Sequence, residues 1–256
     1  MKLDYNQQAF FELLRAGLWA DRDEFQVSDS STSEAAKPSV KFHGSVDWEK
    51  VYQLAEEQSV IGLLLSGLEH SDVKPHQDFL LQWIGEVQII EQQNLAMNKF
   101  VAQLIEKLRK NDINALLVKG QGIAQCYERP LWRASGDIDL LSDADNYFKA
   151  KQYCDKIADS RSLDTEKNKE RLHQEYQIGD WSVELHGTMH ADLSRRMDHV
   201  IDQVQSETFS KNQVRVWKNG DTEVYLPSSD NDVIFVFSHI LQHLFFEGVG
   251  LRQICE

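Results

Sequence analysis

The sequence predicts an α+β protein, in which a small mixed β-sheet is flanked by helical segments on its N-terminal and C-terminal sides. Three observations predict this class. Residues 1–111 carry apolar side chains at helical spacing, residues 113–226 contain short apolar or alternating runs typical of strands, and residues 227–256 return to a helical pattern. A hydrophobic share of 41% in 256 residues allows a sizeable buried core.

These patterns divide the chain into five segments. They are an N-terminal helix (1–20), a flexible linker rich in serine and charge (21–45), a helical segment (46–111), a mixed α/β core (112–226) and a C-terminal helical segment (227–256). Within the helical segment, Asp47 is expected to cap a first helix, and two further helices are expected over 76–93 and 94–110. The last residues, GVGLRQICE, are expected to begin a helix that continues in a longer protein.

Charge and cysteine content exclude several classes of protein. The chain has 27 Lys and Arg against 41 Asp and Glu, a net charge of -14. This balance disfavours nucleic acid as a partner, because phosphate contacts need clustered cations. Cys126, Cys154 and Cys255 form no CxxC pair, and the N-terminus does not resemble a signal peptide. No apolar run reaches the ~20 residues of a membrane span, so we expect a cytoplasmic protein without a membrane partner.

Two hairpins are expected in the α/β core. The segment EYQIGDWSVELHG should turn at Gly179–Asp180, and RVWKNGDTEVYL should turn at Asn219–Gly220 as a type I′ turn. In the second arm of the first hairpin, Ser182, Glu184 and His186 share the polar face, because side chains alternate along a strand.

The segment SGDIDLLS carries the strongest chemical signal. Asp137 and Asp139 share one face of a predicted strand, where their side chains would lie ~6–7 Å apart. Two carboxylates at that distance repel each other unless a cation lies between them, and oxygen ligands suit Mg²⁺ or Mn²⁺. A pair of such ions could support an in-line phosphoryl displacement. A solvent-facing strand edge with two solubilising acids is the alternative.

Three further features favour phosphate chemistry. Lys119–Gly120 ends the preceding strand, where glycine lets backbone amides approach a phosphate and lysine supplies charge. Glu184 lies on the polar face of a later strand, as a third metal ligand or a general base requires. Arg133 precedes the aspartate pair and could contact a phosphate through two nitrogens. Each residue could instead be an ordinary surface charge.

The run KGQGIAQCYERPLWRASGDIDLL resembles the nucleotidyltransferase superfamily that includes DNA polymerase beta. It is most similar to the bacterial branch known as uncharacterised nucleotidyltransferase. Members of that branch also carry a later strand matched here by VELHG (183–187) and a helix with spaced histidines matched by HILQHLFFEGVGLRQI (239–254). The resemblance covers most of residues 45–256.

The resemblance implies a site and a reaction. Asp137, Asp139 and Glu184 would be the catalytic, metal-binding carboxylates. The nucleotide would be bound by Lys119, Gly120, Arg133 and Gly136. The implied enzyme uses Mg²⁺ or Mn²⁺ to move a nucleotidyl group from an NTP, such as ATP, to a hydroxyl of a small molecule or protein, releasing pyrophosphate. The sequence differs from the usual pattern of the superfamily at two positions. Gly120–Gln121 stands where the superfamily usually has Gly-Ser, and the third acid is Glu rather than Asp.

Three histidines are candidate substrate contacts. His239 and His243 are four residues apart on one predicted helix, and His186 follows Glu184 on its strand. The helical pair could hold zinc, although no HExxH motif is present, or could make polar contacts over the active-site cleft.

Two other functions fit parts of the pattern. The first is a non-catalytic nucleotide-binding or regulatory module of the same fold, which the missing Ser after Gly120 keeps open. The second is a glycosyltransferase whose Asp-x-Asp holds Mn²⁺ and a nucleotide-sugar. Such enzymes usually place a nucleotide-binding α/β half before that motif, whereas here the preceding stretch is helical with one short strand.

Overall fold

The computed structural model describes residues 3–19, 40–42, 44–163, 165–166, 172–246 and 248–256. Most of the predicted linker 21–45 lies outside these residues. The chain forms two compact units, each described by itself. The first comprises Met1–Asn94, Tyr127–Ala134 and Gly250–Cys255, and the second comprises Leu95–Cys126, Ser135–Val249 and Glu256.

The first unit is helical. It contains α1 (Tyr5–Trp19), α2 (Trp48–Glu57), α3 (Ile61–Glu69), the beginning of α4 (Gln77–Arg109), a short 3₁₀ helix η2 (Pro130–Trp132) and α10 (Leu251–Ile254). The predicted cap of α2 is confirmed, because an Asp47 carboxylate oxygen accepts a hydrogen bond from the Lys50 backbone N–H at 3.3 Å. Leu13, Leu64 and Trp83 are fully buried in the core of this unit.

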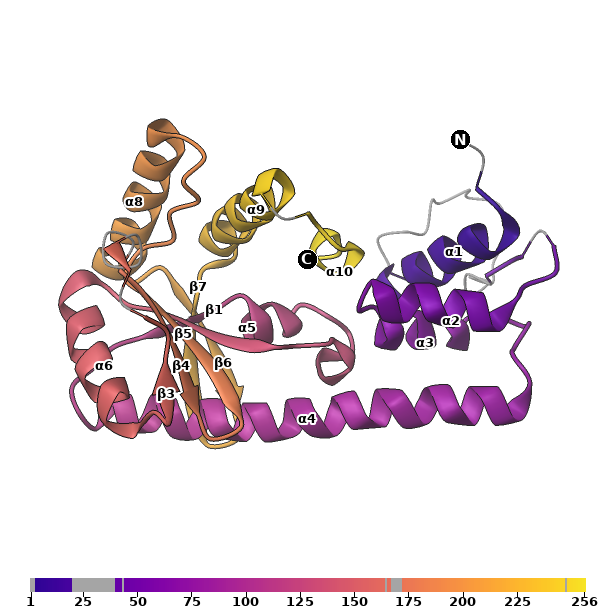
Figure 1. Cartoon of the computed structure of the whole chain (residues 1–256), viewed down its shortest axis with the longest axis horizontal. Helices are drawn as coiled ribbons and strands as arrows, with labels where there is room; N and C mark the ends of the chain where they lie inside the picture. Colours follow the sequence, from indigo (N-terminus) through magenta and orange to yellow (C-terminus); the bar gives the residue numbers. More distant parts are fainter. Residues whose placement is uncertain (1–2, 20–39, 43, 164, 167–171, 247) are drawn as a thin grey trace, which may run out of the picture. The chain divides into compact units, whose positions relative to one another are not determined.

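Helix α4 is one continuous helix, drawn in purple along the lower edge of Figure 1. The two helices expected over 76–93 and 94–110 are therefore wrong as separate elements. No glycine or proline lies near residue 94 to interrupt the backbone. Asn94 is buried, and its side-chain amide donates to the Leu131 and Arg133 carbonyls at 2.7 and 2.8 Å instead of capping a helix end.

The described part of the second unit contains two β-sheets. Five strands pair in the order β1-β2-β5-β4-β3, and β6 and β7 form a separate hairpin. Their bounds are β1 (Leu116–Val118), β2 (Asp137–Leu141), β3 (Ser160–Arg161), β4 (His173–Ile178), β5 (Trp181–His186), β6 (Val214–Asn219) and β7 (Thr222–Pro227). Strands β2 and β5 are parallel, while the other pairs are antiparallel. The predicted α+β class with a small mixed sheet is confirmed.

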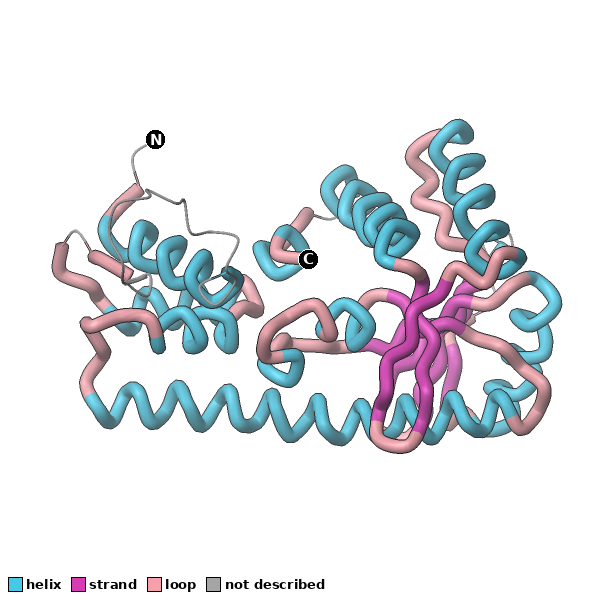
Figure 2. The backbone as a smooth tube through the Cα atoms, turned by 180° about the vertical axis from the view of Figure 1, so that it is seen from behind, coloured by secondary structure: helices cyan, strands magenta, loops and turns pink. Residues whose placement is uncertain are grey.

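Helices complete this unit. Among the described residues they are α5 (Gly120–Ala124), α6 (Ala144–Ile157), α8 (Arg195–Ser210), α9 (Ser229–Phe246) and the C-terminal part of α4. Figure 1 shows α6 on one side of the five strands, and Figure 2 shows the strands gathered in magenta from behind. The core on one face of the sheet joins α4 and α6 to the strands, with Val101, Ile138, Leu140, Cys154 and Val183 almost fully buried.

The two hairpins turn at Gly-Asp pairs. The turn at Gly179–Asp180 is confirmed, with Ile178 paired to Trp181 and a positive φ of 60° at the glycine. The type I′ turn at Asn219–Gly220 is wrong by one residue. Asn219 still pairs with Thr222, so the two-residue loop is Gly220–Asp221. Positive φ at Gly220 and not at the following residue fits a type II′ turn, which places glycine first.

Candidate active site

Two parallel strands bring three carboxylates together. Asp139 on β2 lies directly opposite Glu184 on β5, and Asp137 lies opposite Ser182. Because side chains alternate along both strands, these acids share the face opposite the apolar core. One carboxylate oxygen from each of Asp137, Asp139 and Glu184 lies within 4.8 Å of the others. The structure thus unites acids 47 residues apart in the sequence.

Lys119 is a buried cation beside these acids. Its Nζ lies 2.8 Å from the Asp139 Oδ1, and only 11% and 2% of the two side chains are exposed. Burial disfavours the charged form of each group, but the mutual attraction is stronger. It raises the pKa of Lys119 and, together with a hydrogen bond from His186, lowers the pKa of Asp139. Both groups are therefore charged at neutral pH.

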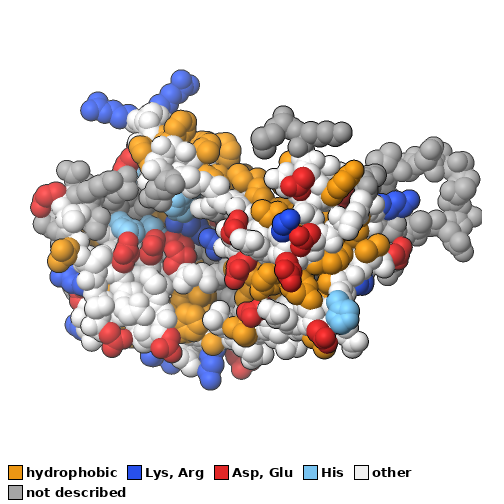
Figure 3. Space-filling model, turned by 45° about the vertical axis from the view of Figure 1, so that its right-hand side comes forward, with side chains coloured by type: hydrophobic (Ala, Val, Ile, Leu, Met, Phe, Trp, Pro, Cys, Tyr) orange, Lys and Arg blue, Asp and Glu red, His pale blue; other side chains and the backbone are white. Residues whose placement is uncertain are grey.

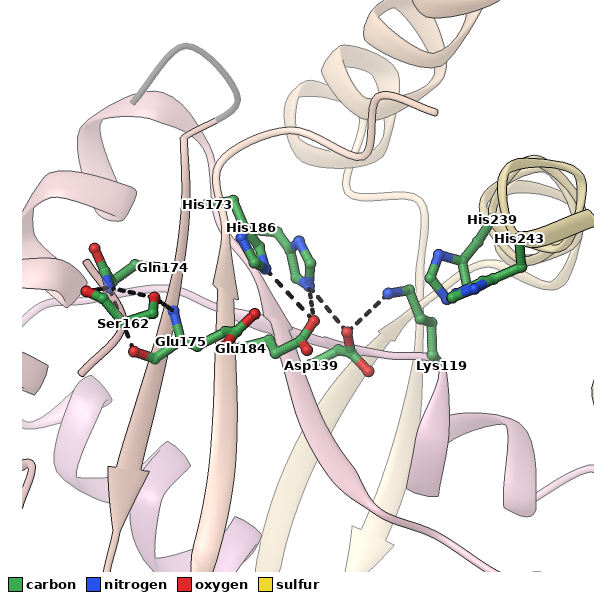
Figure 4. Close-up of polar contacts among 10 residues, drawn as sticks. All are labelled: Lys119, Asp139, Ser162, His173, Gln174, Glu175, Glu184, His186, His239 and His243. Carbon is green, nitrogen blue, oxygen red and sulfur yellow. Dashed lines mark hydrogen bonds and ion pairs between the residues drawn. The ribbon is translucent and has the colours of Figure 1, made fainter. Parts of the chain in front are cut away.

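His186 lies between two carboxylates, as Figure 4 shows. Its Nε2 is 2.9 Å from the Asp139 Oδ1 and 3.4 Å from the Glu184 Oε2. His173 on β4 approaches the same Glu184 oxygen at 3.5 Å. Although burial favours the neutral acid, hydrogen bonds from His173 and His186 lower the pKa of Glu184. Glu184 is consequently a stable anion and a weak base, which suits a ligand better than a proton acceptor.

Asp137 lies at the partly exposed end of β2. Burial and the charges of Asp139 and Glu184 raise the pKa of Asp137. The three acids carry more negative charge than Lys119 neutralises, and a divalent cation among them would offset this excess. Their oxygen donors fit Mg²⁺ or Mn²⁺. Figure 3 shows a row of acidic side chains next to histidines on the left of the visible face.

The turn after β1 has an unusual backbone. Lys119 has φ +54° and Gly120 has φ +34°, and a Cβ at Gly120 would lie 3.3 Å from the Asp137 carbonyl oxygen. This turn brings the first residues of α5 against the end of β2. Gln121, which stands in place of the expected Ser, is buried, and its Nε2 contacts the Met97 Sδ at 3.1 Å.

The other two predicted nucleotide-binding residues are Gly136 and Arg133. Gly136 is exposed, and a Cβ there would meet no atom within 4 Å. Arg133 belongs to the first unit, where it is 5% exposed and its Nη1 donates to the Ala134 carbonyl at 3.3 Å. The structure brings Lys119 and Gly120 to the aspartates, while phosphate binding by Arg133 and Gly136 stays a prediction.

His239 and His243 on α9 lie on the Lys119 side of the site (Figure 4). Their Nε2 atoms are 3.0 Å apart, so they share a hydrogen bond. Burial, the charge of Lys119 and the neighbouring His243 lower the pKa of His239 to about 3. Among the residues that the structure describes, no third metal-binding side chain joins this pair. Polar contact beside the site, one of the two expectations, therefore agrees with this arrangement better than a zinc site.

His173 is a site residue that the sequence interpretation missed. Antiparallel pairing of β4 and β5 places it opposite His186. The signal was present in the sequence, because a two-residue turn at Gly179–Asp180 fixes every later pair of the hairpin. Residues equidistant from that turn face each other, and His173 and His186 are such a pair.

A family comparison covers the part of the chain that contains this site. The chain belongs to the family described as uncharacterised nucleotidyltransferase, which matches residues 44–256. Neither a curated protein nor a solved structure matches the chain. The matched range contains the three carboxylates, Lys119 and both histidine pairs. In the described part of the chain, no helix is both long enough and apolar enough to span a bilayer.

Proposed function

We propose that this protein transfers a nucleotidyl group from an NTP to an acceptor hydroxyl and releases pyrophosphate. The cluster of Asp137, Asp139 and Glu184 on two paired strands carries this proposal, since it is a set of oxygen ligands next to a buried lysine. Family membership supports nucleotidyl transfer over the glycosyltransferase alternative. We place the family in the polymerase-beta-like superfamily, in its bacterial branch, on the motifs KG, GDIDLL and VELHG.

The reaction makes one bond to phosphorus and breaks another. The acceptor oxygen bonds to the α-phosphorus, and the bond from that phosphorus to the β-bridging oxygen breaks. Pyrophosphate leaves with the electron pair, and the hydroxyl proton passes to solvent. Catalysis of such a transfer rests on positioning and on neutralising phosphate charge.

The residues divide these tasks. Asp137, Asp139 and Glu184 would hold Mg²⁺ or Mn²⁺, which when bound supplies positive charge and Lewis acidity next to the phosphates. Lys119 is oriented by Asp139 and adds a fixed positive charge. The amides that begin α5 at Gly120 lie against the end of β2, where they could donate to a phosphate oxygen.

Net charge and cysteine content bear on the acceptor and on the cellular location. An excess of 14 negative charges favours a small-molecule or protein acceptor over a nucleic acid. We also propose a cytoplasmic location, because three cysteines without CxxC spacing do not indicate the disulfide framework of a secreted protein.

Thermal unfolding with each NTP, with and without Mg²⁺, tests the nucleotide site. Ligand at ~100 times its dissociation constant should stabilise the folded protein by about 2.7 kcal/mol. We expect Mg²⁺-dependent stabilisation by at least one NTP, and its loss in Asp137→Asn. Without ligand, Asp137→Asn should be at least as stable as the wild type, because the change removes repulsion with Asp139 and Glu184.

Asp180→Asn is the matched control, since Asp180 is exposed in the hairpin turn. It should keep the full Mg²⁺-dependent stabilisation. Label transfer from an α-³²P NTP to an acceptor, lost in Asp137→Asn and kept in Asp180→Asn, would then demonstrate turnover. Nucleotide binding that survives Asp137→Asn, or the absence of binding by any NTP, would contradict the proposal. Binding without label transfer would favour the non-catalytic module.

A further inference from the structure

A second group of metal-binding side chains lies next to the three acids. It consists of His173 on β4 with Glu184 and His186 on β5, and the ligand atoms of all three lie within 4.8 Å of one another. The two histidines are direct cross-strand partners, and Glu184 precedes His186 by two residues on the same face. Figure 4 shows both rings pointing toward the Glu184 carboxylate.

The spacing of these atoms suits a metal. The Glu184 Oε2 is 3.5 Å from the His173 Nε2 and 3.4 Å from the His186 Nε2. Ligands ~2.1 Å from a tetrahedral ion lie ~3.4 Å apart, so both edges fit one ion. Both contacts are long for hydrogen bonds, so an ion that replaced them would displace only weak interactions.

The three side chains are held in place but reachable. His173 and Glu184 are 21% and 23% exposed, and His186 is 10% exposed. The hairpin fixes their backbones, since β4 and β5 pair over six residues each. Three protein ligands with access from solvent leave coordination positions open for water or a substrate, as in catalytic rather than structural zinc sites.

We propose that His173, Glu184 and His186 form a second metal site that binds a transition-metal ion of the Zn²⁺ class. Imidazole nitrogens favour such ions, whereas Mg²⁺ prefers oxygen ligands. The site is separate from the Asp137, Asp139 and Glu184 set in its chemistry and shares only Glu184 with it. It goes beyond nucleotidyl transfer, because these ligands would bind the ion whether or not an NTP is used.

Occupancy would rearrange the contacts of His186. Its Nε2 now lies 2.9 Å from the Asp139 Oδ1, and coordination would replace that hydrogen bond. Asp139 would retain Lys119 as its partner at 2.8 Å. Glu184 would then belong to both groups, with its Oε2 toward the histidines.

Calorimetric titration with Zn²⁺, in buffer free of chelators, tests the site. The wild type and Asp137→Asn should each bind one ion with similar affinity. In His173→Ala the affinity should fall at least ~100-fold, since loss of even an outer-shell partner costs about 10–100-fold. If His173→Ala does not fold, as judged by circular dichroism, His173→Gln takes its place, because it retains a polar side chain but no imidazole. Visible absorption of the Co²⁺ complex, altered in the same variant, would show that His173 takes part in coordination.

His190→Ala is the control. His190 lies with Asp192 and Asp198 in another histidine–carboxylate group, so Zn²⁺ binding there would be lost in this variant. Unchanged affinity in His173→Ala, loss of binding in Asp137→Asn or in His190→Ala, or no binding by the wild type would each overturn the proposal. The outcome is independent of the nucleotide test: Zn²⁺ binding can persist when no NTP binds, and NTP binding can persist without Zn²⁺.

Discussion

Lys119 adopts a backbone conformation that few side chains favour, with φ +54° and ψ −149° at the junction of β1 and α5. Residues held in such sparsely populated regions cost about 1–3 kcal/mol and persist where the surrounding structure determines them. Here the buried contact with Asp139 and the following turn at Gly120 supply that constraint. The strained backbone lies at the residue proposed to face the phosphates, and Asp139 holds the ammonium group of that residue.

His239 should make the stability of the fold sensitive to mild acid. Its pKa is lowered to about 3, so between pH ~6.5 and ~3 the unfolded chain binds a proton at this position that the folded chain does not. Stability contributed by the neutral ring is therefore present above pH ~6.5 and is lost as the pH falls, by up to about 1.4 kcal/mol per pH unit. In His239→Gln this part of the decline should disappear.

Urea unfolding at pH 7, 6 and 5 measures the effect. His199→Gln, at an exposed position of α8, serves as the control and should retain the wild-type slope. Parallel pH profiles for the wild type and His239→Gln would show that His239 does not titrate as the structure indicates.

At the scale of elements, α1 and α3 pack through glycines. A Cβ at Gly17 would meet the Leu63 carbonyl oxygen, and a Cβ at Gly67 would meet the Leu13 carbonyl oxygen. These reciprocal contacts involve backbone atoms that cannot move aside as a flexible side chain would. The close approach of the two helices therefore depends on both glycines.

Gly67→Ala and Gly85→Ala form a matched pair of helix substitutions. Gly67→Ala should lower the free energy of unfolding by about 1–3 kcal/mol or more, through overpacking against α1. Gly85 lies inside α4, where a Cβ meets no atom within 4 Å. Gly85→Ala should therefore raise the free energy of unfolding by about 0.5–1 kcal/mol. Urea unfolding followed by circular dichroism compares the two, and equal stabilities would refute the packing argument.

For the whole molecule, net charge is the dominant electrostatic feature. The chain carries 14 more negative than positive charges, and these repel one another in the folded state. Dissolved salt screens this repulsion, with a Debye length of about 10 Å at 0.1 M. Raising NaCl from ~20 to ~300 mM should therefore stabilise the fold by about 1 kcal/mol, or about 2–4 °C in the unfolding midpoint.

Differential scanning calorimetry at several NaCl concentrations measures this shift. Chloride is preferable to sulfate, because sulfate also strengthens apolar burial. The buried Lys119–Asp139 pair is shielded from salt and should not reverse the trend. A midpoint that falls with added NaCl would mean that attractive surface pairs outweigh the net repulsion.

Much of this protein was determined locally by its sequence. The alternation of Asp137, Ile138, Asp139 and Leu140 fixes a strand with one acidic and one apolar face, and Asp143 caps the next helix by accepting a hydrogen bond from the Asn146 backbone N–H. The turn at Gly179–Asp180 fixes the register of a hairpin. Neighbouring residues control the cap and the turn, because hydrogen bonds within a helix, cap or tight turn join positions only a few residues apart. The two faces of the strand follow from the alternation of side chains along it.

Tertiary structure alone decided which strands meet. The parallel pairing of β2 and β5 sets Glu184 beside Asp139, and the packing of Tyr127–Ala134 assigns that short segment to the helical unit. Local pattern does not encode such pairings, since any strand with an apolar face could pair with any other until the whole core is packed. The sequence thus predicted most of the residues that build the site, while the order of strands in the sheet determined which of them lie close together.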